Sequence, residues 1–77
     1  METVYLLTEA LAHKNRARWI ASELAASGFL ANGKLPSKTE IARKIYFAAR
    51  ITNTKATRKT VQESARLLHT ELARRWQ

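Results

Sequence analysis

Apolar side chains recur every three or four residues along most of this 77-residue chain, which is the spacing of one face of an α-helix. The first such stretch predicts a helix from Thr8 to Ser27. Its apolar face, with Leu6 just ahead of the helix, comprises Leu6, Ala10, His13, Ala17, Ile20 and Leu24. Gly28 suits the left-handed position after a helix, and Phe29 can fold back on the last turn. Residues 1–7 fit either a short strand or the first turns of the same helix.

A second helix is predicted over residues 37–50, after a connection that contains the turn signal Asn32-Gly33. Ser37 and Glu40 have the spacing of a capping box, in which the serine hydroxyl and the glutamate carboxylate each accept from the other residue's backbone N–H. The stripe expected to be buried comprises Ile41, Ala42, Ile45 and Ala49. Arg43, Lys44 and Arg50 lie away from it.

A third helix is predicted over residues 57–76, with Thr57 as its N-cap, because the polar segment 51–56 interrupts the apolar pattern. Its buried face is expected to comprise Val61, Ala65, Leu68, Leu72 and Trp76. These three elements predict an all-α fold: a single domain over residues 1–77, built as a small bundle of three or four helices with no β wing. Residues 1–30 would be its scaffold.

Composition supports this picture and excludes several classes of protein. Glycine (2) and proline (1) are scarce, which favours helix over sheet. Cysteine is absent, so disulfides and thiolate zinc sites are excluded. No apolar run approaches the roughly 20 residues that a membrane-spanning helix needs. The N-terminus does not have the pattern of a signal peptide, so a cytoplasmic location is expected.

The net charge of +8 comes entirely from one part of the chain. Residues 1–30 hold three basic and three acidic side chains, whereas residues 31–77 hold eleven basic and three acidic ones. A concentrated positive segment in a very small protein is the electrostatic footprint of a polyanion-binding surface.

Two helices with alanine-rich faces, joined by a short polar segment, fit a helix-turn-helix, whose second helix enters the DNA major groove with its N-terminal half. Arginine matches the acceptors of guanine, and glutamine matches the donor–acceptor pair of adenine. The residues predicted to read bases are Arg58, Lys59, Gln62 and Arg66. Those predicted to contact phosphates are Lys34, Ser37, Lys38, Arg43, Lys44, Arg50, Lys55, Thr57 and Thr60.

Four short motifs follow one another along the chain: Leu35-Pro36-Ser37, Glu40-Ile41-Ala42, Arg58-x-Thr60-Val61-x-Glu63 and Arg66-Leu67-Leu68. With these motifs, residues 20–69 resemble the helix-turn-helix part of GntR-type bacterial transcriptional regulators. It implies that Ser37 and Lys38 lie at the DNA backbone, that Thr60 binds phosphate and that Arg58 contacts a base. Gln62 stands where the family often has a second arginine.

The chain also departs from that family's pattern. Thr39 replaces the usual backbone-binding arginine, and the connection that precedes Arg58 is longer and lacks the family's Gly-Val turn. The family's wing and effector domain have no counterpart. A divergent DNA-binding module without a small-molecule effector is therefore expected.

The sequence thus predicts specific binding of double-stranded DNA, to repress transcription or to organise a DNA site. Its small size suits a plasmid- or phage-borne bacterial regulator, located at the nucleoid or on a plasmid. One such module covers only a few base pairs, so a homodimer or an array on repeated sites is expected. Two alternatives are a basic adaptor or inhibitor that docks on an acidic protein, and an RNA-binding protein. RNA binding is disfavoured because the chain lacks an aromatic sheet surface or a clamp loop.

The remaining notable residues favour ordinary structural roles. His13 and His69 are far apart in a chain without cysteine, so neither is expected to bind metal. Trp19 and Trp76 are expected to be packing residues. The pair Tyr46-Phe47 is expected in the core or in a dimer contact. Since no phosphate loop, nucleophile–base pair or carboxylate cluster is present, neither an enzyme nor a cofactor is expected.

Overall fold

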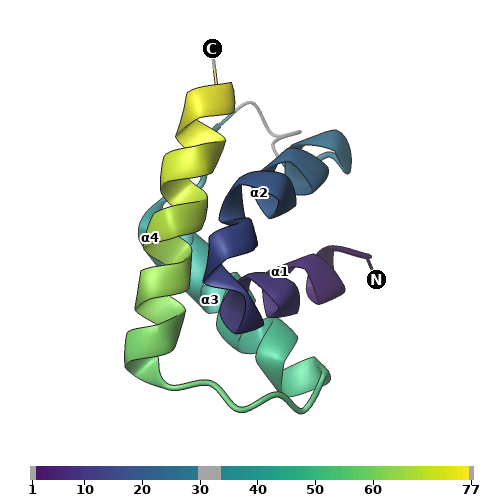
Figure 1. The fold of residues 1–77 in the computed structure, drawn as a ribbon, viewed down its shortest axis with the longest axis vertical. Coiled ribbons are helices and arrows are strands. Elements are labelled where there is room, and N and C mark those ends of the chain that lie inside the picture. The colour runs from purple at the N-terminus through teal and green to yellow at the C-terminus, as the bar shows by residue number, and fades with distance from the viewer. Residues whose placement is uncertain (1, 30–33, 77) are drawn as a thin grey trace.

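The computed structural model describes residues 2–29 and 34–76, and within these it contains four α-helices and one short 3₁₀-helix. The elements are α1 (Glu2–Ala12), η1 (Lys14–Arg16), α2 (Ala17–Ala26), α3 (Lys38–Ile51) and α4 (Arg58–Arg75). The long helix α4 packs against both α2 and α3, and α1 packs across α3 (Figure 1). The predicted all-α bundle is confirmed, and the undecided segment 2–7 is helical. The predicted turn at Asn32-Gly33 lies outside the described residues.

The prediction of one continuous helix from Thr8 to Ser27 is wrong. His13 has φ −133° and ψ 80°, which ends α1, and a 3₁₀ turn then leads into α2. Residues 13–16 are all exposed, so this stretch has no side chain to anchor it in the core, and His13 does not lie on the apolar face as expected. The break lets α1 pack on α3 while α2 packs on α4, which one straight helix could not do. The polar run His-Lys-Asn-Arg was the sequence signal for it.

The end of α2 has the geometry expected from its sequence. Gly28 adopts φ +89°, in the left-handed region where a side chain would be strained. The backbone N–H of Phe29 donates to the carbonyl of Leu24 at 3.0 Å, and the N–H of Gly28 donates to Ala25 at 3.3 Å. These two bonds make a Schellman motif, and its usual apolar contact is present because half-buried Phe29 packs against the core.

Helix α3 ends in the same way with a different residue in the left-handed position. Asn53 has φ 55°, and the N–H of Thr54 donates to the carbonyl of Ala49 at 2.7 Å. Asparagine tolerates this conformation better than most residues with a side chain, which explains why α3 can end here. The connection to α4 then runs from Thr52 to Thr57.

Both predicted helix starts are confirmed. The Ser37 hydroxyl accepts from the Glu40 backbone N–H at 3.1 Å, and the Glu40 carboxylate accepts from the Ser37 N–H at 3.2 Å, which completes a capping box. At α4, the Thr57 hydroxyl accepts from the Thr60 N–H at 3.1 Å.

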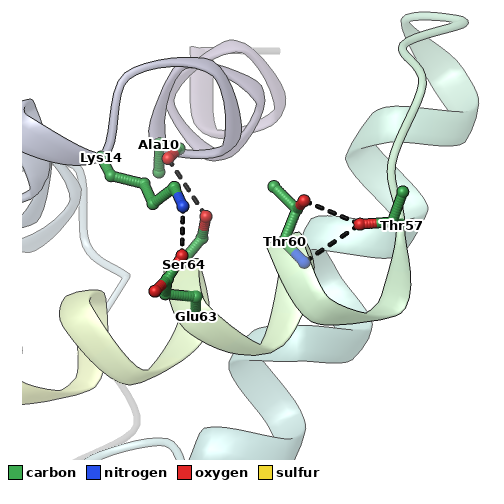
Figure 2. A network of polar contacts seen from close by, with 6 residues as sticks. All are labelled: Ala10, Lys14, Thr57, Thr60, Glu63 and Ser64. Carbon is green, nitrogen blue, oxygen red and sulfur yellow. Dashed lines mark hydrogen bonds and ion pairs between the residues drawn. The ribbon is translucent and has the colours of Figure 1, made fainter.

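The core collects apolar side chains from all four helices. Its largest fully buried members are Ile20, Leu24, Ile41, Ile45, Val61, Leu68 and Leu72. One polar residue joins them: Ser64 is 1% exposed, and its hydroxyl donates to the carbonyl of Ala10 at 3.3 Å, which ties α4 to α1 (Figure 2). Trp76 does not anchor α4 in the core as expected. It follows the last helical residue and is 37% exposed.

Within residues 2–29 and 34–76, no helix combines the length and the apolar character that crossing a membrane requires.

Candidate nucleic-acid interface

The four residues predicted to read bases form one surface on α4. Arg58, Lys59, Gln62 and Arg66 are all exposed. At about 100° per residue, they fall within roughly a third of the helix circumference. We call this surface the α4 outer face. It covers the first half of the helix, while the adjacent side of α4 contributes Val61, Ala65, Leu68 and Leu72 to the core.

A hollow of 370 Å³ borders the α4 outer face where α4 meets the beginning of α3. Its lining comprises Lys38, Thr39, Ala42, Gln62, Ala65 and Arg66. We call it the basic groove. The two alanines carry only methyl groups, so they leave a depression between the longer side chains. The groove brings Lys38, a predicted phosphate contact, beside Gln62 and Arg66, two predicted base readers.

Thr39 lines the basic groove, although it is not among the contacts predicted from the sequence. The capping box places Thr39 in the first turn of α3, and this turn could be predicted from the sequence. Which side of that turn faces α4 depends on how the two helices cross, and this crossing could not be predicted. The threonine hydroxyl is a donor and acceptor suited to a phosphate oxygen.

The capping hydroxyls near the interface keep a limited capacity for further bonds. The Ser37 hydroxyl accepts from Glu40, which leaves its own O–H to donate elsewhere. The Thr57 and Thr60 hydroxyls lie 2.7 Å apart, so one donates to the other and a single O–H remains (Figure 2). These two threonines can therefore offer one hydrogen bond to a phosphate between them, although each was predicted to contribute separately.

Ion pairing separates the basic side chains into two groups. Lys14 pairs with Glu63, Arg16 with Glu9 at 2.9 Å and Arg75 with Glu71 at 3.5 Å. These pairs join elements of the bundle or neighbouring turns. In contrast, none of the basic residues between positions 34 and 66 has an ion pair within the described part of the chain; they are Lys34, Lys38, Arg43, Lys44, Arg50, Lys55, Arg58, Lys59 and Arg66.

The start of α4 concentrates positive potential further. Its first turn holds Arg58 and Lys59 and has no acidic residue. Helix N-termini carry a partial positive charge, so cations here cost stability, about 0.3–1 kcal/mol each at exposed positions. The first turn of α3 instead holds an acidic residue, Glu40, whose negative charge stabilises the start of that helix. The charge placement on α4 therefore favours attraction of an anion over stability of the helix.

Glu63 marks the acidic boundary of the α4 outer face. Its hydrogen bond and ion pair with Lys14 lower the pKa of this carboxyl below its ordinary value, and the charges of Arg66 and Lys59 lower it further. Figure 2 shows Lys14 reaching from η1 to this carboxylate, one residue from the buried Ser64. Glu63 therefore stays ionised at neutral pH and reduces the positive potential beside two predicted base readers.

The other predicted phosphate contacts are spread over the surface and do not join the basic groove. Lys34 precedes α3, and Lys55 lies in the connection between α3 and α4. Lys44 lies with its ammonium 5.9 Å from the centre of the Phe29 ring, toward the end of α2. Arg43 and Arg50 are exposed elsewhere on α3. These five residues can contribute to the overall positive field but do not line the groove.

Several aromatic residues expected to be packed are instead exposed. Trp19 is 47% exposed and lies under the Arg16 guanidinium, 4.5 Å from the ring centre. Tyr46 and Phe47 are 42% and 63% exposed, so the prediction that they belong to the core is wrong. The alternative prediction of a dimer contact is compatible with their exposure.

No family model matches the chain, and no curated protein or solved structure matches it either. The resemblance to GntR-type regulators therefore stays a prediction based on the residues quoted above.

Proposed function

We propose that this protein binds double-stranded DNA through the α4 outer face and the basic groove, and acts as a small bacterial repressor or organiser of a DNA site. The observation that supports this most is the run of nine basic residues from Lys34 to Arg66 without an ion pair in the described structure. A surface that served solubility alone would mix both signs of charge.

In this proposal, the first half of α4 lies in the major groove. Arg58, Gln62 and Arg66 reach base edges, and Lys38 and Thr39 at the start of α3 contact the flanking phosphates. Both helices line the basic groove, so one phosphate there can approach both of them. Phosphate contacts supply most of the affinity, and the long side chains of α4 supply the preference for a sequence. Binding in the cytoplasm, at the nucleoid or on a plasmid, follows from the same proposal.

The first test is to select a preferred sequence from random duplex DNA and to titrate it at several salt concentrations. Each neutralised phosphate contributes a slope of about −0.9 to log affinity against log salt. We expect a steep linear dependence and a preferred sequence that competes better than scrambled DNA. Heparin serves as a polyanion without base edges. Equal competition by heparin, scrambled duplex and selected duplex would exclude sequence-specific binding and favour a general acidic partner.

The variant Arg58→Ala separates base reading from charge. It is expected to lose about 1–3 kcal/mol of binding free energy on the selected duplex and to discriminate less among base pairs at one position. The matched control is Arg74→Ala, which removes the same charge from an exposed position near the other end of α4. An equal loss in the two variants would show that Arg58 contributes charge alone.

A further inference from the structure

A second groove lies on the other helices and has the opposite chemistry. It has a volume of 460 Å³, and its lining comprises Tyr5, Leu6, Thr8, Glu9, Ala12, Trp19, Glu23 and Thr52, from α1, α2 and the end of α3. We call it the acidic groove. It shares no lining residue with the basic groove, so the two sites can be tested separately.

The walls of the acidic groove are aromatic and anionic. Tyr5 is 66% exposed and Trp19 is 47% exposed. Glu9 is held by Arg16, whose guanidinium also lies against Trp19. Glu23 is exposed and has no ion pair in the described part of the chain. On a protein with net charge +8, such a groove fits a surface that is both apolar and basic.

The outer end of α3 is a surface of that kind. Phe47 is 63% exposed and Ile51 is 47% exposed, and the two are one helical turn apart. Arg50 lies between them in sequence and is exposed without an ion pair in the described residues. Large apolar side chains grouped in this way on a small protein are typical of an interaction surface.

The acidic groove and the outer end of α3 are neighbours on one molecule. Ile51 is the last residue of α3, and the next residue, Thr52, lines the groove. The Thr52 hydroxyl lies 3.3 Å from that of Thr8 on α1, which fixes the end of α3 against the groove wall. In a two-fold dimer each copy uses the same patch, so a patch that contains both a groove and an adjacent complementary surface can pair with itself.

We propose that two copies of this chain form a two-fold dimer in which the outer end of α3 of each copy occupies the acidic groove of the other. Phe47 and Ile51 lie against Tyr5 and Trp19, and Arg50 pairs with Glu23 across the interface. This inference does not rest on DNA binding. Arg50 lies twelve positions from Lys38, or about 18 Å along α3, so the proposed dimer contact and the basic groove lie toward opposite ends of this helix.

The test uses the whole chain without DNA in sedimentation equilibrium over a range of concentrations. The wild-type mass is expected to rise with concentration from 8.8 kDa to about twice that value. Glu23→Arg and Arg50→Glu each place like charges at the interface, and each is expected to raise the dimer dissociation constant roughly tenfold or more. An equimolar mixture of the two variants restores opposite charges at both contacts and is expected to dimerise better than either variant alone.

Ser22→Arg is the matched control, because Ser22 is exposed beside Glu23 on α2 and does not line the groove. Phe47→Ser tests the apolar part without changing charge, and circular dichroism checks that each variant keeps its helices. A wild-type mass that stays at 8.8 kDa at millimolar concentration would overturn the proposal. So would rings or open arrays larger than a dimer, or a mixture that dimerises no better than its two components.

Discussion

Two grooves on one small bundle differ in almost every chemical respect. The basic groove lies between α3 and α4 and presents Lys38, Gln62 and Arg66 over two alanines. The acidic groove lies along α1 and presents two glutamates and two exposed aromatic rings. Their volumes, 370 and 460 Å³, are similar, so size does not separate them. The difference shows that this chain sorts its charges over its surface.

The basic residues that stabilise the fold through ion pairs also differ from those around the basic groove. Lys14, Arg16 and Arg75 form ion pairs, and Arg75 also donates to the carbonyl of Arg18 at 3.1 Å, which ties the end of α4 to α2. The cations around the basic groove form no such pairs in the described structure. These cations therefore add no ion-pair stabilisation to the fold, and their charge stays available to a ligand.

The largest expected effect comes from the core that both grooves share. Leu68→Ala removes a fully buried side chain from α4 and is expected to lower the free energy of unfolding by about 2–5 kcal/mol. For so small a domain this is a large share of the total stability. Urea denaturation followed by circular dichroism measures the loss. The neighbouring Leu67 is only half-buried, so Leu67→Ala is the control and is expected to cost clearly less.

This variant also tests whether the two grooves depend on one folded unit. DNA binding and dimerisation are both expected to weaken in Leu68→Ala in proportion to the unfolded fraction. Loss of one activity while the other is kept, in a chain that is still helical, would mean that the grooves belong to separately stable parts.

A smaller effect is expected at the start of α3, where one residue serves stability and adjoins the basic groove. Ser37→Ala removes the cap and is expected to cost about 1 kcal/mol of stability. Ser37→Asp keeps an accepting oxygen for the Glu40 N–H and is expected to preserve stability in urea denaturation. Its new negative charge lies next to Lys38, so the affinity for duplex DNA is expected to fall.

The acidic groove provides the contrast for this pair of variants. Neither substitution touches that groove, so the dimer dissociation constant is expected to stay unchanged in Ser37→Asp. Equal DNA affinity in Ser37→Asp and in the wild type would place the start of α3 outside the DNA interface.

The sequence predicted well the features that depend on residues close together along the chain. The capping box at Ser37, the N-cap at Thr57 and the left-handed Gly28 each involve a few neighbouring residues, and all three are confirmed. The buried stripe of α3 was right for Ile41, Ile45 and Ala49. It wrongly included Ala42, which is only half-buried, and it lacked Ala48, which is fully buried.

The features that depend on how helices meet could not be predicted in the same way. The periodic apolar pattern continued through His13, so the break between α1 and α2 was missed even though four polar residues mark it. Thr39 was missed because its place in the basic groove depends on the crossing of α3 and α4. The acidic groove was missed entirely, because Tyr5 and Trp19 come together only after the chain turns at residues 13–16.

The smallest expected effect is at Glu63, the carboxylate beside the α4 outer face, which is the proposed DNA interface. Its pKa is lowered chiefly by the hydrogen bond and charge of Lys14, so the ion pair favours the folded state when Glu63 is ionised. That contribution is present above the ordinary glutamate pKa of 4.5 and is lost as the pH falls through the lowered value. Both side chains are partly exposed, so the resulting decrease in the melting temperature on acidification is expected to be small.

Glu63→Gln separates the two roles of this carboxylate. It is expected to remove the Lys14–Glu63 contribution to the acid dependence of the melting temperature, measured against the wild type from pH 6 to pH 3. The same variant removes the negative charge nearest to Lys59 and Arg66, so its affinity for duplex DNA at low salt is expected to rise a few-fold. A gain in DNA affinity together with an unchanged dimer would show that the charge of Glu63 acts on the basic groove alone. An affinity that stays constant or falls would mean that DNA does not approach the α4 outer face.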